Sequence, residues 1–338
     1  MLTQNLIEEL KSTITELSAP GKGLLAADES TGTISKRFSA LNIPCTEETR
    51  RDYRELLLTA PGISKYISGV ILYEETLAQK TSQNISFSEI LQKQSIVPGI
   101  KVDKGLVPLL GTFEENTTQG LDGLAERLAE YKKQGARFAK WRVVYAISKN
   151  TPSWQLIQTN AEVLARYAAI CQGSGIVPIV EPEVLIEGEH TLAMCESVTE
   201  KVLQTVFNAL HLHKVLLEYI LLKPNMVVPG KNSPLQANPA EIAEATLKVI
   251  LRSVPAAVPS INFLSGGQTP EAATLNLNAM HRLKSPLPWN LSFSYARALQ
   301  EPSMKAWLGK GENTEVAQQA FLERAQFNSL ASMGKIQF

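Results

Sequence analysis

Short, almost continuously apolar segments recur along the chain, and each gap between them is long enough for a helix. Segments rich in Val and Ile with few polar positions are typical of strands buried on both faces of a parallel sheet. Parallel neighbours need a long crossover, which is usually a helix. The predicted strands cover residues 23–28, 67–73, 97–103, 138–147, 176–184, 219–226, 261–267 and 288–297.

Helical patterns in the gaps support the same alternation. Asn238, Pro239 and Glu241 combine an N-cap, a first-turn proline and an acidic third position, so a helix is predicted to begin there. Residues 269–271 repeat this device. Two further helices are predicted from apolar faces, which consist of Leu121, Leu124, Ala125, Leu128 and Ala129, and of Val198, Val202, Val206 and Leu210.

Eight strands that alternate with helices predict an α/β protein with a (β/α)8 TIM barrel. No Pro-, Gly- or Ser-rich linker divides the sequence, so a single domain over residues 1–338 is expected. The barrel should carry an N-terminal helical arm, which ends at Pro20, and a C-terminal helical segment from about Pro302. An open, doubly wound sheet is the alternative, but the first strand is not followed by the GxGxxG turn of such folds.

Composition and charge limit the range of partners. The chain has 338 residues, of which 44% are hydrophobic and 20% charged, as is typical of globular proteins. Its 33 basic and 33 acidic side chains give a formal net charge of zero, which offers no electrostatic reason to bind nucleic acid or anionic lipid. No apolar run approaches the roughly 18 residues of a membrane span. We therefore expect no nucleic-acid partner and no membrane association.

The cysteines and the N-terminus bear on location. Three cysteines without a CxxC spacing argue against a disulfide framework or a structural zinc site, and they fit a reducing compartment. The N-terminal segment contains Glu8, Glu9 and Glu16 and no continuous apolar stretch, so it does not resemble a targeting signal. A cytoplasmic location is expected, and a presequence removed before this numbering would leave no trace.

Ionisable residues interrupt the predicted strands, where apolar side chains would be expected. In several strands two charges are spaced i, i+2, and a strand directs such residues to the same side. Burial costs several kcal/mol per ion unless the charges pair. At the carboxyl ends of barrel strands, polar residues build active sites. The set consists of Asp28, Lys101, Asp103, Lys140, Arg142, Glu181, Glu183 and Lys223.

These mixed charges predict a pocket for an anionic substrate and for proton transfer. A rim or snorkelling role is the alternative, and for Asp103 the two interpretations stay equally open. Lys223 follows three apolar residues, and burial with nearby positive charges favours its neutral amine, which can form a Schiff base with a carbonyl. For Lys223, a core lysine paired with Glu181 or Glu183 remains the alternative.

A second feature predicts an anion site. Ser265, Gly266 and Gly267 end the seventh strand just before a helix, where glycines let backbone N–H groups turn toward a ligand. Arg297 at the end of the eighth strand would complete a phosphate clamp, although a tight structural turn is the alternative. Arg37 either reaches a second anionic group or is a solvated helix charge.

Metal ligands are poorly represented. The chain has four histidines, and none lies inside a predicted strand. His211 and His213 are two residues apart on a predicted helix, which is not the i, i+4 spacing that a metal site prefers. No metal site is therefore predicted.

Seven segments also follow the signature motifs of a known family. LLAADEST, GIKVDKG, FAKWR, VPIVEPE, LLKPNMV, FLSGGQ and FSYARALQ occur in the family's order and spacing, from about residue 10 to residue 335. Together they resemble class I fructose-bisphosphate aldolase. The resemblance implies reversible cleavage of fructose 1,6-bisphosphate to dihydroxyacetone phosphate and glyceraldehyde 3-phosphate, in glycolysis, gluconeogenesis or carbon fixation, without a metal or other cofactor.

The resemblance also implies roles for individual residues. Lys223 matches the lysine that forms the Schiff base, Glu181 the general acid and base of imine formation, and Asp28 the aspartate that moves the proton of the C4 hydroxyl. The other matches are Glu183, Lys140 and Lys101 in the charge network, Arg142 as a neighbouring arginine, Ser265, Gly266, Gly267 and Arg297 at one phosphate, and Arg37 near the other.

Some expectations follow from the family alone. A phosphosugar substrate and a homotetramer are implied. The chain ends at Phe338, without the longer tyrosine-terminated tail of many members, and Ala296 stands where those members tend to have glycine. Another Schiff-base aldolase or transaldolase-like barrel is an alternative, against which the two phosphate sites argue. A non-catalytic scaffold is a further one, but it would predict loss of Lys223, Glu181 or Asp28, and all are present.

Overall fold

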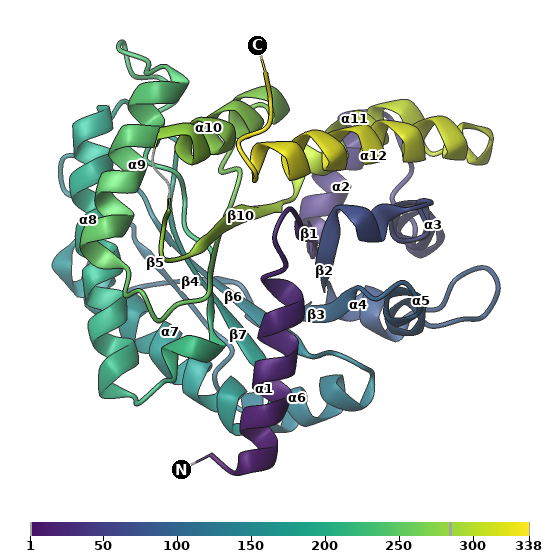
Figure 1. Ribbon diagram of the computed structural model, residues 1–338, viewed down its shortest axis with the longest axis horizontal. Coiled ribbons are helices and arrows are strands. Elements are labelled where there is room, and N and C mark those ends of the chain that lie inside the picture. Colours follow the sequence, from purple (N-terminus) through teal and green to yellow (C-terminus); the bar gives the residue numbers. More distant parts are fainter. Residues whose placement is uncertain (1, 284–285, 338) are drawn as a thin grey trace.

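The computed structural model describes residues 2–283 and 286–337, and its centre is a closed barrel of parallel strands (Figure 1). The order around the ring, β1-β10-β9-β8-β7-β6-β3-β2, follows the order of these strands along the chain. The predicted TIM barrel is therefore confirmed, with one strand at each predicted position. Several strands are shorter than predicted: the sixth covers only Leu221–Leu222, the seventh ends at Phe263, before Ser265, and the eighth ends at Tyr295, so Arg297 does not end a strand. The strands are β1 (Gly23–Ala27), β2 (Ile67–Leu72), β3 (Val97–Lys101), β6 (Phe138–Tyr145), β7 (Val177–Val184), β8 (Leu221–Leu222), β9 (Ser260–Phe263) and β10 (Asn290–Tyr295).

Helices surround this ring (Figure 1). They are α1 (Gln4–Leu17), α2 (Thr31–Ser39), α3 (Glu47–Leu58), α4 (Glu74–Ala78), α5 (Phe87–Lys93), α6 (Leu124–Lys133), α7 (Trp154–Gly173), α8 (Leu192–Leu212), α9 (Pro239–Ser253), α10 (Pro270–Leu283), α11 (Arg297–Trp307) and α12 (Thr314–Ala331). Short 3-10 turns cover Ile63–Lys65, Leu217–Tyr219 and Gly311–Asn313. A small antiparallel hairpin, β4 (Leu106–Pro108) and β5 (Asn116–Thr118), lies outside the barrel and was not predicted.

The predicted helix starts are confirmed in detail. The side chain of Asn238 accepts hydrogen bonds from the N–H groups of Ala240 and Glu241, at 2.9 and 3.1 Å. The carboxylate of Glu241 in turn accepts the N–H of Asn238 at 2.8 Å, which completes a capping box. At the next helix Thr269 accepts the N–H of Ala272 at 3.1 Å. Local hydrogen bonding thus fixes where α9 and α10 begin.

Two helix predictions need correction. Helix α6 begins at Leu124, after Gly123 in a left-handed conformation, so the predicted helical residue Leu121 lies before the helix. Ala125 and Ala129, predicted to belong to its apolar face, are exposed, because the helix buries a narrower face than predicted. Pro302 lies inside α11 instead of opening the C-terminal helical segment, because this helix starts directly after β10.

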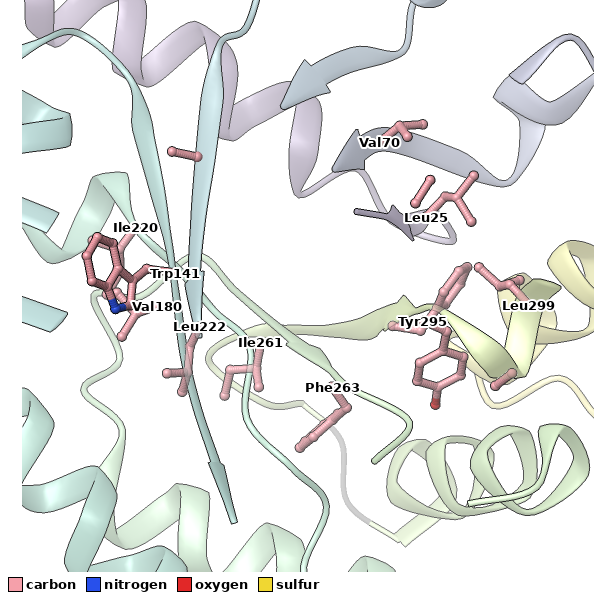
Figure 2. Packing of buried hydrophobic residues seen from close by; sticks show 14 of the residues in the cluster. Leu25, Val70, Trp141, Val180, Ile220, Leu222, Ile261, Phe263, Tyr295 and Leu299 are labelled. Atoms are coloured by element: carbon pink, nitrogen blue, oxygen red, sulfur yellow. The ribbon is translucent and has the colours of Figure 1, made fainter. Parts of the chain in front are cut away.

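The main apolar cluster lies between the barrel and its helices. Figure 2 shows part of it, with Trp141, Val180, Leu222 and Phe263 from four neighbouring strands. These residues alternate with others that face the centre of the barrel, as strand geometry requires. The outer cluster therefore seats the helices, while the opposite face of each strand is left for the interior.

The lower interior of the barrel, at the amino ends of the strands, is a separate apolar cluster. Leu10, Ile14 and Leu17 of α1 pack there against inward side chains such as Phe138. The ring of Phe138 needs the space above Gly99, where a Cβ atom would lie 2.3 Å from it. The predicted N-terminal arm thus closes the lower end of the barrel.

Because side chains alternate along a strand, the inward-facing positions continue up to the carboxyl ends of the strands. Leu24, Val97, Phe138, Ile179 and Leu221 all belong to the inner cluster. Residues an even number of positions further along the same strands keep the same direction. These positions hold the predicted charges, namely Asp28, Lys101, Lys140, Arg142, Glu181, Glu183 and Lys223.

Candidate active site

A cavity of about 270 Å³ opens at the carboxyl ends of the barrel strands. All of the predicted site residues except Asp103 and Gly267 line it. The lining consists of Ala26, Asp28, Glu29, Ser30, Thr33, Arg37, Lys101, Lys140, Arg142, Glu181, Glu183, Lys223, Leu264, Ser265, Gly266, Ser294, Ala296 and Arg297. Residues that are far apart in the sequence are thus brought together, because they lie in the upper parts of the barrel strands or in the segments that follow them.

A chain of ion pairs forms the floor of this cavity. The Nζ atom of Lys140 lies 2.7 Å from Oδ2 of Asp28 and 3.1 Å from Oε2 of Glu181. The other carboxylate oxygen of Glu181 lies 3.0 Å from Nζ of Lys223. The side chains of Lys140, Glu181 and Lys223 are each 4% exposed. Lys223 is therefore a buried lysine that pairs with Glu181, as the alternative interpretation held, and it also lines the cavity.

Burial and pairing act in opposite directions on the acids of this floor. Burial alone would raise the pKa of Asp28, but the positive charges of Lys140, Lys223 and Lys101 lower it well below its ordinary value. The pKa of Glu181 is likewise lowered, against its burial, by Lys140, Lys223 and Arg142. Both carboxyl groups are therefore ionised at neutral pH.

The same balance applies to the cations. Burial would lower the pKa of Lys140, but Asp28 and Glu181 raise it above the ordinary lysine value. Glu183, helped by hydrogen bonding, raises the pKa of Arg142 in the same way. The floor therefore keeps fixed positive charges beside its carboxylates.

Asp103 has a supporting position. Its Oδ1 atom lies 2.6 Å from Nζ of Lys101, and its backbone carbonyl accepts a second hydrogen bond from that amine at 2.9 Å. Asp103 is buried but is not among the lining residues. Asp103 therefore neither lines the cavity nor lies on an exposed rim, the two interpretations left open for it, but pairs with Lys101.

The predicted anion site lies between β9 and α10. Ser265, Gly266 and Arg297, the first residue of α11, all line the cavity. Gly267 is not among the lining residues; its φ of +82° favours glycine, and a Cβ atom there would lie 2.9 Å from Ile186 and 3.6 Å from Nη2 of Arg297. Gly267 thus allows the turn and the close approach of Ile186.

Beside Arg37, which the sequence singled out, the cavity wall at α2 contains three residues that it did not: Glu29, Ser30 and Thr33. Ser30 is the N-cap of α2, and Thr33 and Arg37 lie on that helix. Glu29 also lines the cavity and binds the guanidinium of Arg37. A Ser directly before a helix, followed by Thr and a basic residue one and two turns on, is the signal that could have identified this wall.

Two further findings concern metals and membranes. Within residues 2–283 and 286–337, no group of three or more His, Cys, Asp and Glu side chains is arranged to hold a metal ion. None of the helices in this part of the chain is both long and apolar enough to span a membrane.

The fold and the cavity together define a TIM-barrel enzyme, with paired lysines and carboxylates at the mouth of the barrel and with Arg37 and Arg297 among the lining residues. Comparison with known proteins narrows this class. The model of the family described as "Fructose-bisphosphate aldolase class-I" matches residues 9–338.

Named relatives agree with this match. The chain is 56% identical over 328 residues to "Fructose-bisphosphate aldolase 5, cytosolic" of Arabidopsis thaliana, covering 97% of this chain and 91% of that protein. It is 54% identical to "Fructose-bisphosphate aldolase C" of Homo sapiens, covering 97% and 90%. A solved complex of the Plasmodium falciparum aldolase with TRAP and a small-molecule inhibitor has a TM-score of 0.98 and 49% identity, covering 100% of this chain and 97% of that one.

The chain belongs to the class I fructose-bisphosphate aldolase family. The resemblance seen in the sequence is therefore confirmed, as is the expectation of a carbon–carbon lyase on a TIM barrel. The family acts on phosphosugars, in keeping with a cavity lined by both cations and carboxylates.

Proposed function

We propose that this chain cleaves fructose 1,6-bisphosphate reversibly through a Schiff base on Lys223. The observation that carries the proposal is the buried pair of Lys223 and Glu181, whose Nζ and Oε1 atoms lie 3.0 Å apart at the edge of the cavity. An amine beside a carboxylate can pass its proton to that carboxylate and attack a ketone.

Formation of the imine needs two proton transfers. The amine of Lys223 attacks the C2 carbonyl of the open-chain sugar, and one proton of the attacking nitrogen passes to the C2 oxygen, which becomes the carbinolamine hydroxyl. Glu181, once protonated, gives a proton to this hydroxyl, and water leaves as the nitrogen lone pair forms the C=N bond. The protonated imine stays beside Glu181 and Lys140, within a network that balances its charge.

Cleavage then breaks the bond between C3 and C4. Asp28 takes the proton of the C4 hydroxyl, the C4 oxygen forms a carbonyl, and the electrons of the C3–C4 bond move into the iminium to give an enamine. Glyceraldehyde 3-phosphate leaves. Protonation of the enamine at C3 and hydrolysis of the imine release dihydroxyacetone phosphate and restore the amine. Lys140, 2.7 Å from Asp28, orients this carboxylate.

The two phosphates fix the sugar across the cavity. Asp28 immediately precedes the segment that enters α2, so the half of the sugar that carries C4 and the C6 phosphate lies toward Ser30, Thr33 and Arg37. The C1 phosphate lies toward Ser265, Gly266 and Arg297. Fixing both ends keeps C2 near Lys223 and C4 near Asp28, where a misplacement of about 1 Å can cost 100-fold in rate.

The remaining features of the proposal concern the enzyme as a whole. Residues 1–338 act as one catalytic domain, located in the cytoplasm, and catalysis uses no metal. The chain works as a homotetramer, for which exposed apolar side chains at the β4–β5 hairpin and the start of α7 offer contact surface: Leu110 is 86% exposed, Phe113 65% and Trp154 49%.

Borohydride trapping tests this mechanism. The protein is incubated with dihydroxyacetone phosphate and a chelator, reduced with borohydride, digested and mapped by mass spectrometry. We expect a reduced adduct on Lys223 and undiminished cleavage activity in the chelator, because an imine accepts the electrons without metal. An adduct on another lysine, or activity that the chelator removes and added divalent metal restores, would overturn the proposal.

A further inference from the structure

A buried arginine behind the site binds one of the lining carboxylates. Glu29 follows Asp28 at the end of β1, and strand alternation turns it outward, to the side of Leu25 and Ala27, toward the helices. One of its oxygens binds Nη1 of Arg37 on α2. Its other oxygen lies 2.6 Å from Nη2 of Arg54 on α3.

The two arginines differ in access. Arg37 lines the cavity with its side chain 19% exposed, whereas Arg54 is 4% exposed and is not among the lining residues. Glu29, also 4% exposed, lies between them. Across the part of the chain that the structure describes, Glu29 is the carboxylate within salt-bridge distance of Arg54.

Arg54 changes the charge that the cavity presents. Two arginines and one carboxylate carry a net charge of +1, whereas Glu29 and Arg37 alone would be neutral. Burial raises the pKa of Glu29, but Arg54 and Arg37 lower it overall, so the carboxylate stays ionised beside Asp28. Removing Arg54 would therefore leave Arg37 to balance Glu29 by itself.

We propose that Arg54 is a positioning residue, which neutralises Glu29 from behind and so leaves the charge of Arg37 available to the C6 phosphate of the substrate. The inference rests on the proposed function, in particular on the assignment of that phosphate to α2. It predicts that loss of Arg54 weakens binding of the C6 phosphate and not of the C1 phosphate. A residue that merely stabilised the fold would affect every substrate alike.

Two ketose phosphates separate these outcomes. Fructose 1-phosphate lacks the C6 phosphate, so the ratio of kcat/KM for the bisphosphate to kcat/KM for fructose 1-phosphate reports on the α2 side. We expect Arg54→Met to lower this ratio roughly tenfold, mainly through a higher KM for the bisphosphate. Arg54→Gln, which keeps a polar partner for Glu29 without the charge, should do the same, and it provides the test if the methionine variant does not fold.

A paired variant and a matched control sharpen the test. Glu29→Gln combined with Arg54→Met leaves Arg37 without a competing carboxylate, so the ratio should return to within about threefold of wild type. Arg50 lies on the same helix, where its Nη2 atom is 2.7 Å from Glu75, and it does not line the cavity. Arg50→Met should therefore leave the ratio unchanged, whatever it does to the melting temperature.

The other possible results distinguish a wrong role for Arg54 from a wrong assignment of the C6 phosphate. Equal losses for both substrates in both Arg54 variants, or no recovery in the paired variant, would overturn the role of Arg54. Arg37→Ala is measured alongside: if it lowers the ratio while the Arg54 variants do not, this inference alone fails. If Arg37→Ala leaves the ratio unchanged, the assignment of the C6 phosphate to α2 fails, and the inference fails with it; trapping on Lys223 is independent of either result.

Discussion

The lower and upper halves of the barrel interior are built by the same strands, but the lower half is apolar and the upper half is charged. In β6, Phe138 packs in the apolar lower cluster and Lys140, two residues on, joins the ion pairs. β7 changes in the same way from Ile179 to Glu181, and β8 leads from Leu221 to Lys223. Two residues of strand span about 7 Å, so the boundary is sharp.

The direction of a side chain and its chemical environment have different causes in these strands. Strand alternation decides that all of these side chains face inward, and the position along the strand decides whether they meet apolar neighbours or the cavity. Burial of the lower side chains contributes about 1.5–3 kcal/mol each. Burial of the upper ions costs several kcal/mol each, which pairing offsets. The lower half therefore stabilises the barrel, and the upper half supplies the chemistry.

The largest effect is expected from Lys223→Met. Methionine keeps the apolar stem of the side chain but has no amine, so no imine forms and turnover should be abolished. Binding of the phosphosugar, measured by calorimetry, should largely persist, because both phosphate walls remain. Turnover near the wild-type rate would show that Lys223 is not the nucleophile.

Phe138→Ala is the matching change in the lower half. Loss of a buried aromatic ring costs about 3–5 kcal/mol of unfolding free energy, measured by urea denaturation. The ring lies below the ion pairs and does not line the cavity, so kcat of the folded variant should stay within about threefold of wild type. A loss of kcat as large as that of Lys223→Met would show that the two halves are not separable.

Acid should weaken the upper half selectively. Asp28 and Glu181 have lowered pKa values in the folded protein, so their pairing stabilises the fold above the ordinary pKa of about 4 and is lost as the pH falls through the lower, folded values. The unfolding free energy should therefore fall as the pH decreases below about 5.

The variant Glu181→Gln tests which residues cause this dependence. Because it lacks one of the carboxylates with a lowered pKa, its unfolding free energy should change less steeply between pH 5 and pH 3, two values chosen around the ordinary pKa of about 4. Parallel curves for the two proteins, measured by denaturant titration at each pH, would assign the acid sensitivity to other groups.

The smallest effect is expected from Ala296→Gly. Ala296 lines the cavity directly before Arg297 and keeps its backbone N–H, so removal of its methyl group should only relax the approach of the phosphate. We expect KM for the bisphosphate to change by about twofold. A change of more than tenfold in steady-state kinetics would make this position a determinant of binding.

The sequence predicted the barrel well because buried parallel strands leave continuous apolar runs. Charged residues stand out inside such runs, which is why Lys140, Glu181 and Lys223 could be identified. The hairpin of β4 and β5 was missed because its strands have three residues each and no alternation of polarity. Phe338, where the comparison with longer family members would begin, lies outside the described residues.

Glu29 and Arg54 show where this kind of prediction stops. Glu29 lies just beyond the strand, in a region where charges are common. Arg54 is one of several charged residues on α3, and its pattern does not distinguish it from Arg50 or Arg51. Their pairing depends on how α3 packs against the end of β1, which no local pattern encodes. Buried charges on helices therefore cannot be predicted from the same signal, which is a charge inside an apolar strand.

Helix α1 affects how substrate and products enter and leave at the opposite end of the barrel. Because Leu10, Ile14 and Leu17 fill the amino end, the catalytic centre communicates with solvent on the side of the strand termini that carry the charges. Incoming bisphosphate, departing triose phosphates and exchanging protons share that entrance. We therefore expect a triose phosphate that remains in the cavity to exclude the next bisphosphate.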